Sequence, residues 1–190
     1  MEQMQQHPLV SGQFVQTRQL QGLPRPIISS GNFIFWRQHG LYWETLQPFY
    51  QATTFTRDEV ITWLAPEGPA QPAVSKDPVQ KYVNRILLSV FGADMGMIDK
   101  LFSSQWQSDG DNWSVALTPA NATVEKAIAH AHLSGAQYLQ QLRVTSSSGD
   151  VSTMVFDQVQ AQAQLAAAQC ARFSRNGAIR CPQLATSAVE

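Results

Sequence analysis

The stretch that decides the fold runs from residue 31 to residue 48 and reads GNFIFWRQHGLYWETLQP. Its bulky residues recur at every second position, which is the period of an extended strand. Gln-His-Gly at residues 38–40 interrupts the pattern, so the stretch predicts two antiparallel strands joined by a short turn. The bulky side chains on one face of this hairpin are Phe33, Phe35, Leu41 and Trp43.

Arg37 has the same parity as these apolar residues and is predicted to share their face. Burying a guanidinium costs several kcal/mol unless the group is paired or hydrogen-bonded. The hairpin therefore predicts an apolar wall whose single charge needs a partner from another element.

Short segments rich in aromatic and β-branched residues lie on both sides of this hairpin and predict further strands. A first antiparallel meander is expected at residues 12–21, 27–37, 41–46, 49–56 and 60–64, and a second at residues 105–108, 113–118, 128–134, 138–146 and 151–158. The first meander adds Phe55, Ile61 and Trp63 to the predicted wall. The wall can be the filled core of a sheet or the lining of a cavity.

A proline-rich loop between the meanders ends where a helix is predicted to begin. Asp77 suits the N-cap, Pro78 suits the first helical position, and Gln80 completes a capping-box spacing. Apolar residues then recur at helical spacing up to Gly92, and a second short helix is expected to follow from Asp94. The apolar stripe of the two helices includes Val83, Leu87, Phe91, Met95 and Ile98. An Ala- and Gln-rich run predicts a terminal helix over residues 161–173.

Length, charge and hydropathy limit the classes of protein to which this chain can belong. The 190 residues suit one domain, and only 14% of them are charged, with a net charge of -1. Because no Lys/Arg-dense run is present, we expect no nucleic-acid partner. No apolar run reaches the roughly 20 residues that span a bilayer. The start of the chain lacks a signal-peptide pattern, and Met1 is compatible with an expression start that replaces a removed signal.

No catalytic or metal-binding motif stands out in the sequence. His130 and His132 would share a strand face, but no Cys or carboxylate accompanies them in that element. Asp109 to Asp111 is typical of a hairpin turn, because the calcium-loop pattern is missing. We expect no metal, no cofactor and no enzymatic activity, although a Ser/His/Asp site built from distant segments stays open.

The two cysteines, Cys170 and Cys181, are close enough in sequence to close a short loop. In an oxidising compartment such a disulfide is worth about 3 kcal/mol of chain entropy. Two free thiols in a reducing compartment are the alternative.

The order of several short motifs resembles the periplasmic outer-membrane lipoprotein carriers, the LolA family. They are Gly31, the alternating Phe33 and Phe35, Arg37, the block Leu41-Tyr42-Trp43-Glu44, Pro48, Trp63 at the end of a strand, and Leu117-Thr118-Pro119 after an Asp-Gly hairpin. The resemblance covers roughly residues 10 to 160. The chain departs from the family pattern at Gln38, where the family has proline, and at Leu41, where it has an aromatic residue. A divergent subgroup is therefore expected.

The resemblance implies a mainly β (α+β) fold, an open and incomplete antiparallel β-barrel with helices over its concave apolar face. It implies one domain over residues 1–190, with a helical lid at 78–104 and a C-terminal helix and tail at 161–190. An arginine at the position of Arg37 would lie inside the cavity and hydrogen-bond the lid when the cavity is empty. The expected location is the periplasm, which favours the disulfide.

The function that the resemblance implies is a monomeric, non-enzymatic carrier of lipoprotein acyl chains or a related amphiphile. An inner-membrane donor complex and an outer-membrane acceptor would be its partners. The cavity would be lined by Phe14, Phe33, Phe35, Leu41, Trp43, Ile61 and Trp63. The alternative is a protein-interaction or sensor module on the same fold, with a filled core and no cargo.

Overall fold

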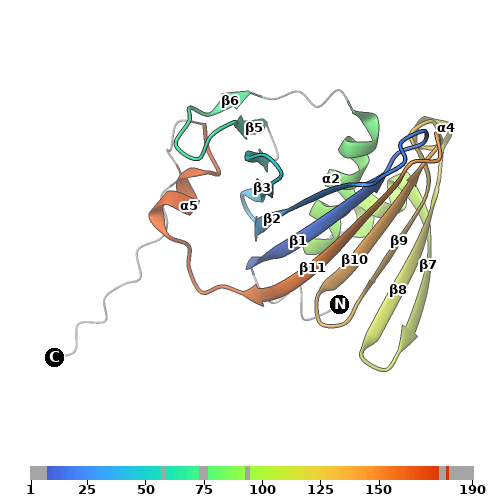
Figure 1. Ribbon diagram of the computed structural model, residues 1–190. Coiled ribbons are helices and arrows are strands. Elements are labelled where there is room, and N and C mark those ends of the chain that lie inside the picture. The colour runs from blue at the N-terminus through green and yellow to red at the C-terminus, as the bar shows by residue number, and fades with distance from the viewer. Residues whose placement is uncertain (1–7, 57–58, 73–76, 93–94, 176–178, 180–190) are drawn as a thin grey trace.

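The computed structural model describes residues 8–56, 59–72, 77–92, 95–175 and 179, which form one eleven-stranded antiparallel sheet (Figure 1). The strands in spatial order are β6 (Gln71–Pro72), β5 (Val60–Trp63), β4 (Gln51–Phe55), β3 (Gly40–Gln47), β2 (Ile27–Trp36), β1 (Leu9–Gln19), β11 (Val151–Ala161), β10 (Leu139–Ser146), β9 (Ile128–Gly135), β8 (Asn112–Pro119) and β7 (Phe102–Asp109). The first and last strands pair with each other, which joins the two predicted meanders into one sheet.

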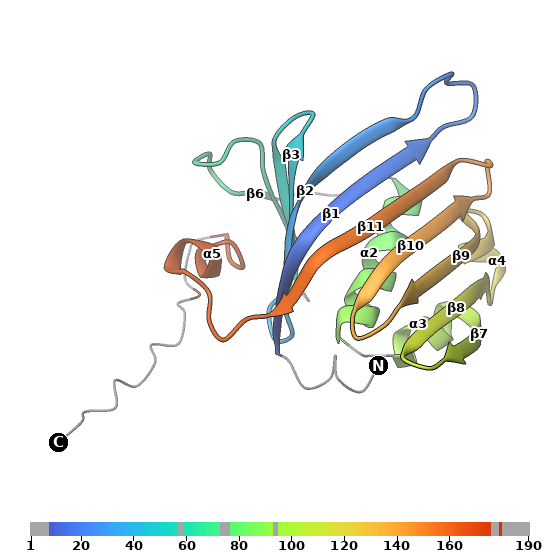
Figure 2. The ribbon, with the colours of Figure 1, turned by 60° about the horizontal axis from the view of Figure 1, so that its bottom comes forward.

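The sheet curves but does not close, because β6 and β7 remain at its two ends. Figure 2 shows helices α2 (Pro78–Gly92) and α3 (Met95–Leu101) inside the curve. The predicted open, incomplete antiparallel β-barrel with helices on its concave face is therefore confirmed. Within the described residues, no helix is long and apolar enough to cross a bilayer.

The face of the sheet under α2 and α3 is called the lid face here. Its core combines side chains of both meanders with the apolar stripe of the helices. The helix residues that are buried in this core are Tyr82, Val83, Ile86, Leu87, Val90, Phe91 and Ile98. One contiguous core thus depends on the helices as much as on the strands.

The opposite face of the sheet is called the outer face. Over β2 to β5 it is covered by the C-terminal segment, including α5 (Ala167–Ala171). This second core contains Leu9, Ile34, Tyr42, Ala52, Ile61, Trp63, Leu165, Cys170 and Phe173. Strand β2 therefore buries alternate residues in two different cores.

Gly31 in β2 is required by the close approach of β3. A Cβ atom on Gly31 would lie 1.8 Å from the backbone oxygen of Glu44, which is far inside van der Waals contact. The register between β2 and β3 also shifts between Ser30 and Gly31. Gly31, the first residue of the stretch 31–48, thus permits the sheet to bend between strands β3–β6 and the long strands β1 and β2.

Two predicted element boundaries are wrong. The helical lid ends at Leu101 instead of residue 104, because β7 begins at Phe102. The predicted helix over 161–173 shortens to α5, since β11 continues to Ala161 to pair with Val10. Strand pairing overrides the helix propensity at Ala161, and residues 162–166 connect β11 to α5 without regular secondary structure.

Several predictions involve residues outside those that the structure describes. Asp94, the expected cap of the second helix, and Cys181 are among them. Cys170 is buried at 1% exposure in the outer core. The Cys170–Cys181 disulfide therefore stays a prediction.

Candidate functional site

The lid face is centred on a cluster of aromatic rings from five elements. Phe14 of β1 stacks on Trp43 of β3 with ring centroids 3.8 Å apart. Phe33 of β2 lies 4.9 Å from Phe91 of α2 and 5.7 Å from Phe156 of β11. Because Phe91 belongs to the helix, lifting α2 would expose this aromatic floor.

Five of the seven predicted cavity residues lie on this face. Phe14, Phe33, Phe35 and Leu41 are buried at 3% exposure or less, and Trp43 packs against them half-buried. The period-two pattern of β2 and β3 therefore predicted this part of the wall correctly. These side chains are covered by α2 rather than by solvent.

The other two predicted cavity residues, Ile61 and Trp63, lie in the outer core instead. Directly opposed residues on paired strands share a face, and Phe55 opposes Val60 across the turn at residues 56–59. Odd-numbered residues of β4 therefore share a face with even-numbered residues of β5. Reading odd positions straight through this turn assigned Ile61 and Trp63 to the wrong face.

The predicted lid residues face the sheet. Val83, Leu87, Phe91 and Ile98 are each exposed by 2% or less and belong to the lid-face core. Met95 begins α3, but its side chain lies outside what the structure describes.

Arg37 does not lie inside the cavity, so its predicted position is wrong. Strand β2 ends at Trp36, and Arg37 is exposed in the turn before β3, where its N–H donates to the carbonyl of Pro8 at 2.8 Å. A turn does not continue the strand's alternation, so the parity argument fails one residue past the strand end.

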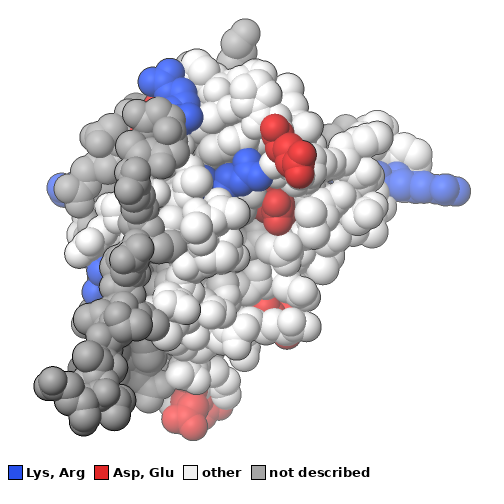
Figure 3. Space-filling model, turned by 90° about the vertical axis from the view of Figure 1, so that its left-hand side faces the viewer, with Lys and Arg blue, Asp and Glu red and all other residues white. Residues whose placement is uncertain are grey.

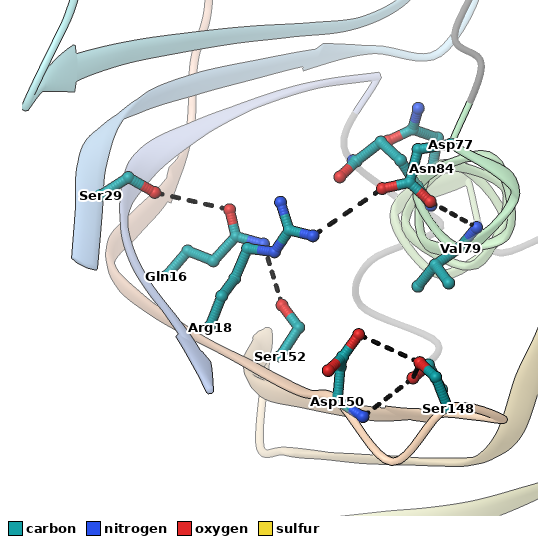
Figure 4. Close-up of polar contacts among 11 residues, drawn as sticks. Gln16, Arg18, Ser29, Asp77, Val79, Asn84, Ser148, Asp150 and Ser152 are labelled. Carbon is teal, nitrogen blue, oxygen red and sulfur yellow. Dashed lines mark hydrogen bonds and ion pairs between the residues drawn. The ribbon is translucent and has the colours of Figure 1, made fainter. Parts of the chain in front are cut away.

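Arg18 contacts the start of the lid. Arg18 of β1 lies 3.8 Å from Asp77, the N-cap of α2, through its Nη2 and the carboxylate Oδ2 (Figure 4). Asp77 also accepts hydrogen bonds from the N–H groups of Val79, at 2.9 Å, and Gln80, at 3.4 Å. The residue that caps the lid helix is therefore also the one that ties it to the sheet.

The lid face becomes polar around this ion pair. Gln16 of β1 donates to Ser152 of β11 at 2.9 Å and accepts from Ser29 of β2 at 3.5 Å (Figure 4). A pocket of about 100 Å³ lies between these strands and the start of α2. We call this region, with Gln16, Arg18 and Ser152, the polar mouth. It was not predicted from the sequence, although Gln16 and Arg18 continue the alternation that begins at Phe14.

Ser89 of α2 is a polar exception within the lid. It is exposed by 1%, and among the described residues its hydroxyl is a buried side-chain oxygen without a hydrogen-bond partner. An unsatisfied buried polar group costs about 1–3 kcal/mol. The closed arrangement of α2 is therefore weaker than a fully apolar helix would give.

The outer core is fastened by specific polar links to the C-terminal segment. Thr54 donates its hydroxyl to the carbonyl of Arg172 at 2.7 Å. The Arg172 guanidinium donates to the carbonyl of Pro66 and lies 5.1 Å from the centre of the Trp63 ring. This cover is thus attached through backbone and side chain together.

Glu44 gathers hydrogen bonds beside the outer core. Its carboxylate accepts from the hydroxyl of Tyr42 at 2.9 Å, from Tyr50 at 3.4 Å and from the amide of Asn32 at 3.4 Å. Burial, together with the Glu44 charge, raises the pKa of Tyr42 well above its usual range. Tyr42 therefore acts as a hydrogen-bond donor at every physiological pH.

His130 and His132 lie exposed on β9. Within the described ranges, no three His, Cys, Asp or Glu residues lie close enough together to hold a metal ion.

An open antiparallel half-barrel whose apolar concave face is covered by helices is a fold of the lipoprotein-carrier type. The chain belongs to the family "outer membrane lipoprotein carrier protein LolA", whose sequence pattern matches residues 6–172. No curated protein sequence matches this chain.

Several solved structures align with this chain at low sequence identity. A DUF1329 family protein from Desulfovibrio piger aligns with a TM-score of 0.50 and 10% identity over 88% of this chain and 91% of the other. A LolA superfamily protein from Nitrosomonas europaea aligns with a TM-score of 0.42 and 11% identity, over 85% and 91% of the two chains. The MucA/MucB complex of Pseudomonas aeruginosa aligns with a TM-score of 0.48 and 14% identity, over 88% and 56%.

Proposed function

We propose that this protein is a non-enzymatic periplasmic carrier that shelters the acyl chains of a lipoprotein or a related amphiphile on its lid face. It would receive them from an inner-membrane donor and deliver them toward an outer-membrane acceptor. The observation that carries the proposal is the apolar aromatic floor of the sheet, which is covered by helices and not by a second sheet. Family membership supports the same reading.

The free energy of burying an acyl chain on the lid face is large enough to displace the lid helix. Each acyl CH₂ removed from water contributes about 0.8 kcal/mol, so one chain of some 15 carbons contributes roughly 12 kcal/mol. Binding must displace Leu87 and Phe91, which are buried on the same floor. The affinity for cargo is set by the free energy of burying the acyl chain minus the free energy of burying the lid side chains that it displaces. A carrier needs this difference to be small enough for release.

The polar mouth supports a direction for the bound amphiphile. Arg18, Gln16 and Ser152 lie at the end of the lid face where α2 begins. A ligand with its acyl chain on the aromatic floor would place its polar end here, where charged and hydroxyl groups replace apolar ones. The ion pair Arg18–Asp77 supports a closing role for these two residues, of the kind that the resemblance implies for Arg37.

The second candidate function is a protein-interaction module with a filled core. The complete burial of Phe33 and Leu41 under α2 favours it, because the face needs no ligand to exclude water. The two candidates differ in whether α2 leaves the sheet when an acyl chain is offered.

Two tryptophans on opposite faces make the test specific. Trp43 lies on the lid face, and Trp63 lies in the outer core. We expect a brominated fatty acid to quench tryptophan fluorescence saturably, with much of the quenching lost in Trp43→Phe and retained in Trp63→Phe. Lipid extraction of the purified protein followed by mass spectrometry would identify a resident cargo.

The carrier proposal fails if no lipid is extracted and the titration does not saturate. Saturable quenching that disappears only in Trp63→Phe would move the ligand to the outer face and would also reject the lid-face site.

A further inference from the structure

The outer face of β1, β2 and β3 carries an open trough beside α5. Two pockets of about 390 Å³ and 710 Å³ form it, and both are lined by Gln13 and Asn32, which oppose each other across β1 and β2. We call this combined feature the outer trough. The residues that line only one of its two pockets include Ser11, Glu44 and Arg172 at one end and Val15, Leu46 and Val155 at the other.

One end of the outer trough is apolar and exposed. Val15 and Val155 oppose each other across β1 and β11 and are 47% and 45% exposed, and Leu46 is 44% exposed. Ile28, at 58%, extends this surface along β2, where it opposes Thr17. Aliphatic side chains gathered on one strand face, and left in solvent, are typical of a surface that binds a partner.

The other end is polar and rich in carboxamides. Glu44 and Arg172 lie there with Gln158, Gln160 and Gln169. Over its whole length the trough presents the amide side chains of Gln13, Asn32, Gln47, Gln140, Gln158, Gln160 and Gln169. Its charged lining residues are Glu44, Asp157 and Arg172, so its charges nearly cancel. Figure 3 shows basic and acidic side chains close together on a largely uncharged face of the molecule.

Backbone strain marks the polar end of the trough. Gln158 has φ +49°, in the left-handed region that a residue with a Cβ seldom adopts. It lies where β11 bulges against β1 between Ser11 and Gln13. Such conformations cost about 1–3 kcal/mol and cluster at binding and catalytic sites.

We propose that the outer trough binds an extended, uncharged segment of a partner polypeptide. Carboxamides offer one donor and one acceptor group each, which matches the N–H and C=O groups of an extended backbone. The apolar end would take alternate aliphatic side chains of that segment. The span from Ser11 to Val15 is about 13 Å at the rise of a strand, which is about four residues of an extended peptide.

Other classes of ligand fit the lining less well. A nucleic acid requires a basic surface, and Arg172 already interacts with Trp63 and Pro66. A free acyl chain would cover the exposed amide of Gln13 with apolar groups, whereas the lid face offers an apolar floor. The proposal does not depend on lipid binding at the lid face.

The test uses the full chain and a phage library of random twelve-residue peptides. Enriched sequences are expected to be uncharged and to carry aliphatic side chains two residues apart. Their synthetic forms should bind in isothermal titration calorimetry and lose affinity at least tenfold in Val155→Glu and in Gln13→Glu. Leu64→Glu, at a 63% exposed site outside the trough, is the matched control and should bind unchanged.

Four outcomes would overturn the proposal. One is the absence of enriched, saturably binding peptides. Another is binding that Val155→Glu leaves unchanged, and the third is binding that the brominated fatty acid abolishes, which would place the peptide on the lid face. If Val155→Glu weakens binding of the fatty acid itself, the trough is a lipid site and the polypeptide assignment is wrong.

Discussion

Both faces of β2 are apolar, but α2 and α3 cover the lid face and the C-terminal segment covers the outer face. Phe33 and Phe35 lie under α2, whereas Ile34 and Trp36 lie under the C-terminal segment. The lid-face cover meets the sheet through apolar contacts and, at its start, through Arg18–Asp77. The outer-face cover is held by the links of Arg172 to Thr54 and Pro66. The proposed function requires the lid-face cover to be removable, whereas the outer-face cover carries specific polar links.

The largest expected effect removes both covers at once by disturbing β2. Gly31→Ala would place a Cβ 1.8 Å from the carbonyl oxygen of Glu44, so β2 and β3 must separate. We expect a loss of stability of about 4 kcal/mol or more, at the severe end for single substitutions, measured by urea unfolding. Gly110→Ala is the control: it has φ +58° but open space around the new Cβ, so only about 1 kcal/mol should be lost.

The next prediction truncates one aromatic residue under each cover. Trp63→Ala and Phe91→Ala should each cost about 3–5 kcal/mol of unfolding free energy, because both side chains are buried. Only Phe91→Ala should also tighten binding of the brominated fatty acid, since it weakens the closed lid that competes with cargo. Equal effects of the two variants on fatty-acid affinity would contradict the distinction between the covers.

The sequence predicted the lid-face wall well and the outer core poorly, for one physical reason. Alternation within β2 and β3 is a local property, so Phe33, Phe35, Leu41 and Trp43 were assigned correctly. The face of the next strands depends on how residues 56–59 turn, and the register shown by Phe55 opposite Val60 is set by pairing and packing. A single-residue difference in that turn would reverse the face of Ile61.

The helix α2 and its cap were predictable because their signals are contiguous. Asp77 and Pro78 stand before an unbroken apolar stripe, and the structure confirms the cap through the N–H of Val79. The partner of that cap could not be predicted, since Arg18 lies 59 residues earlier and reaches Asp77 only through the curvature of the sheet. The placement of Arg37 failed because a strand end cannot be located from alternation alone.

A smaller effect is expected from the unsatisfied hydroxyl in the lid. Ser89→Ala removes a buried polar group without a partner, so the closed state should gain about 1 kcal/mol or more. The variant should slow hydrogen exchange of the α2 amides and weaken fatty-acid binding by a comparable free energy. Ser114→Ala on β8 is a half-buried control that should change neither. A stabilisation that leaves ligand affinity unchanged would show that α2 does not open for the ligand.

The ion pair at the start of α2 should have an effect of about 0.2–1 kcal/mol, because both side chains are roughly 40% exposed and screened by water. Arg18→Gln should raise fatty-acid affinity and the exchange rate of the first α2 amides by up to about fivefold. The matched control is Arg175→Gln, which removes the pair with Glu59 at 3.1 Å, away from the lid. If both variants behave alike, Arg18 does not hold the lid.

The smallest effect concerns pH and the outer cover alone. The His39 ring packs at a tilt against Trp36 with ring centroids 3.8 Å apart and lies 6.4 Å from the ring of Phe173. Burial lowers the pKa of His39 below the usual 6.5. The unfolded chain therefore binds more protons than the folded one as pH falls below about 6.5, so stability decreases there. Above that value both states are neutral at His39, and no contribution remains.

His39→Gln should flatten this part of the stability–pH curve in urea unfolding. The exposed His130→Gln should leave the curve unchanged. The loosening at low pH should be visible in hydrogen exchange of the α5 amides before those of α2, because His39 contacts the outer core and the lid face lies on the other side of the sheet. Earlier exchange of α2 would mean that the two covers are coupled through β2 and are not independent.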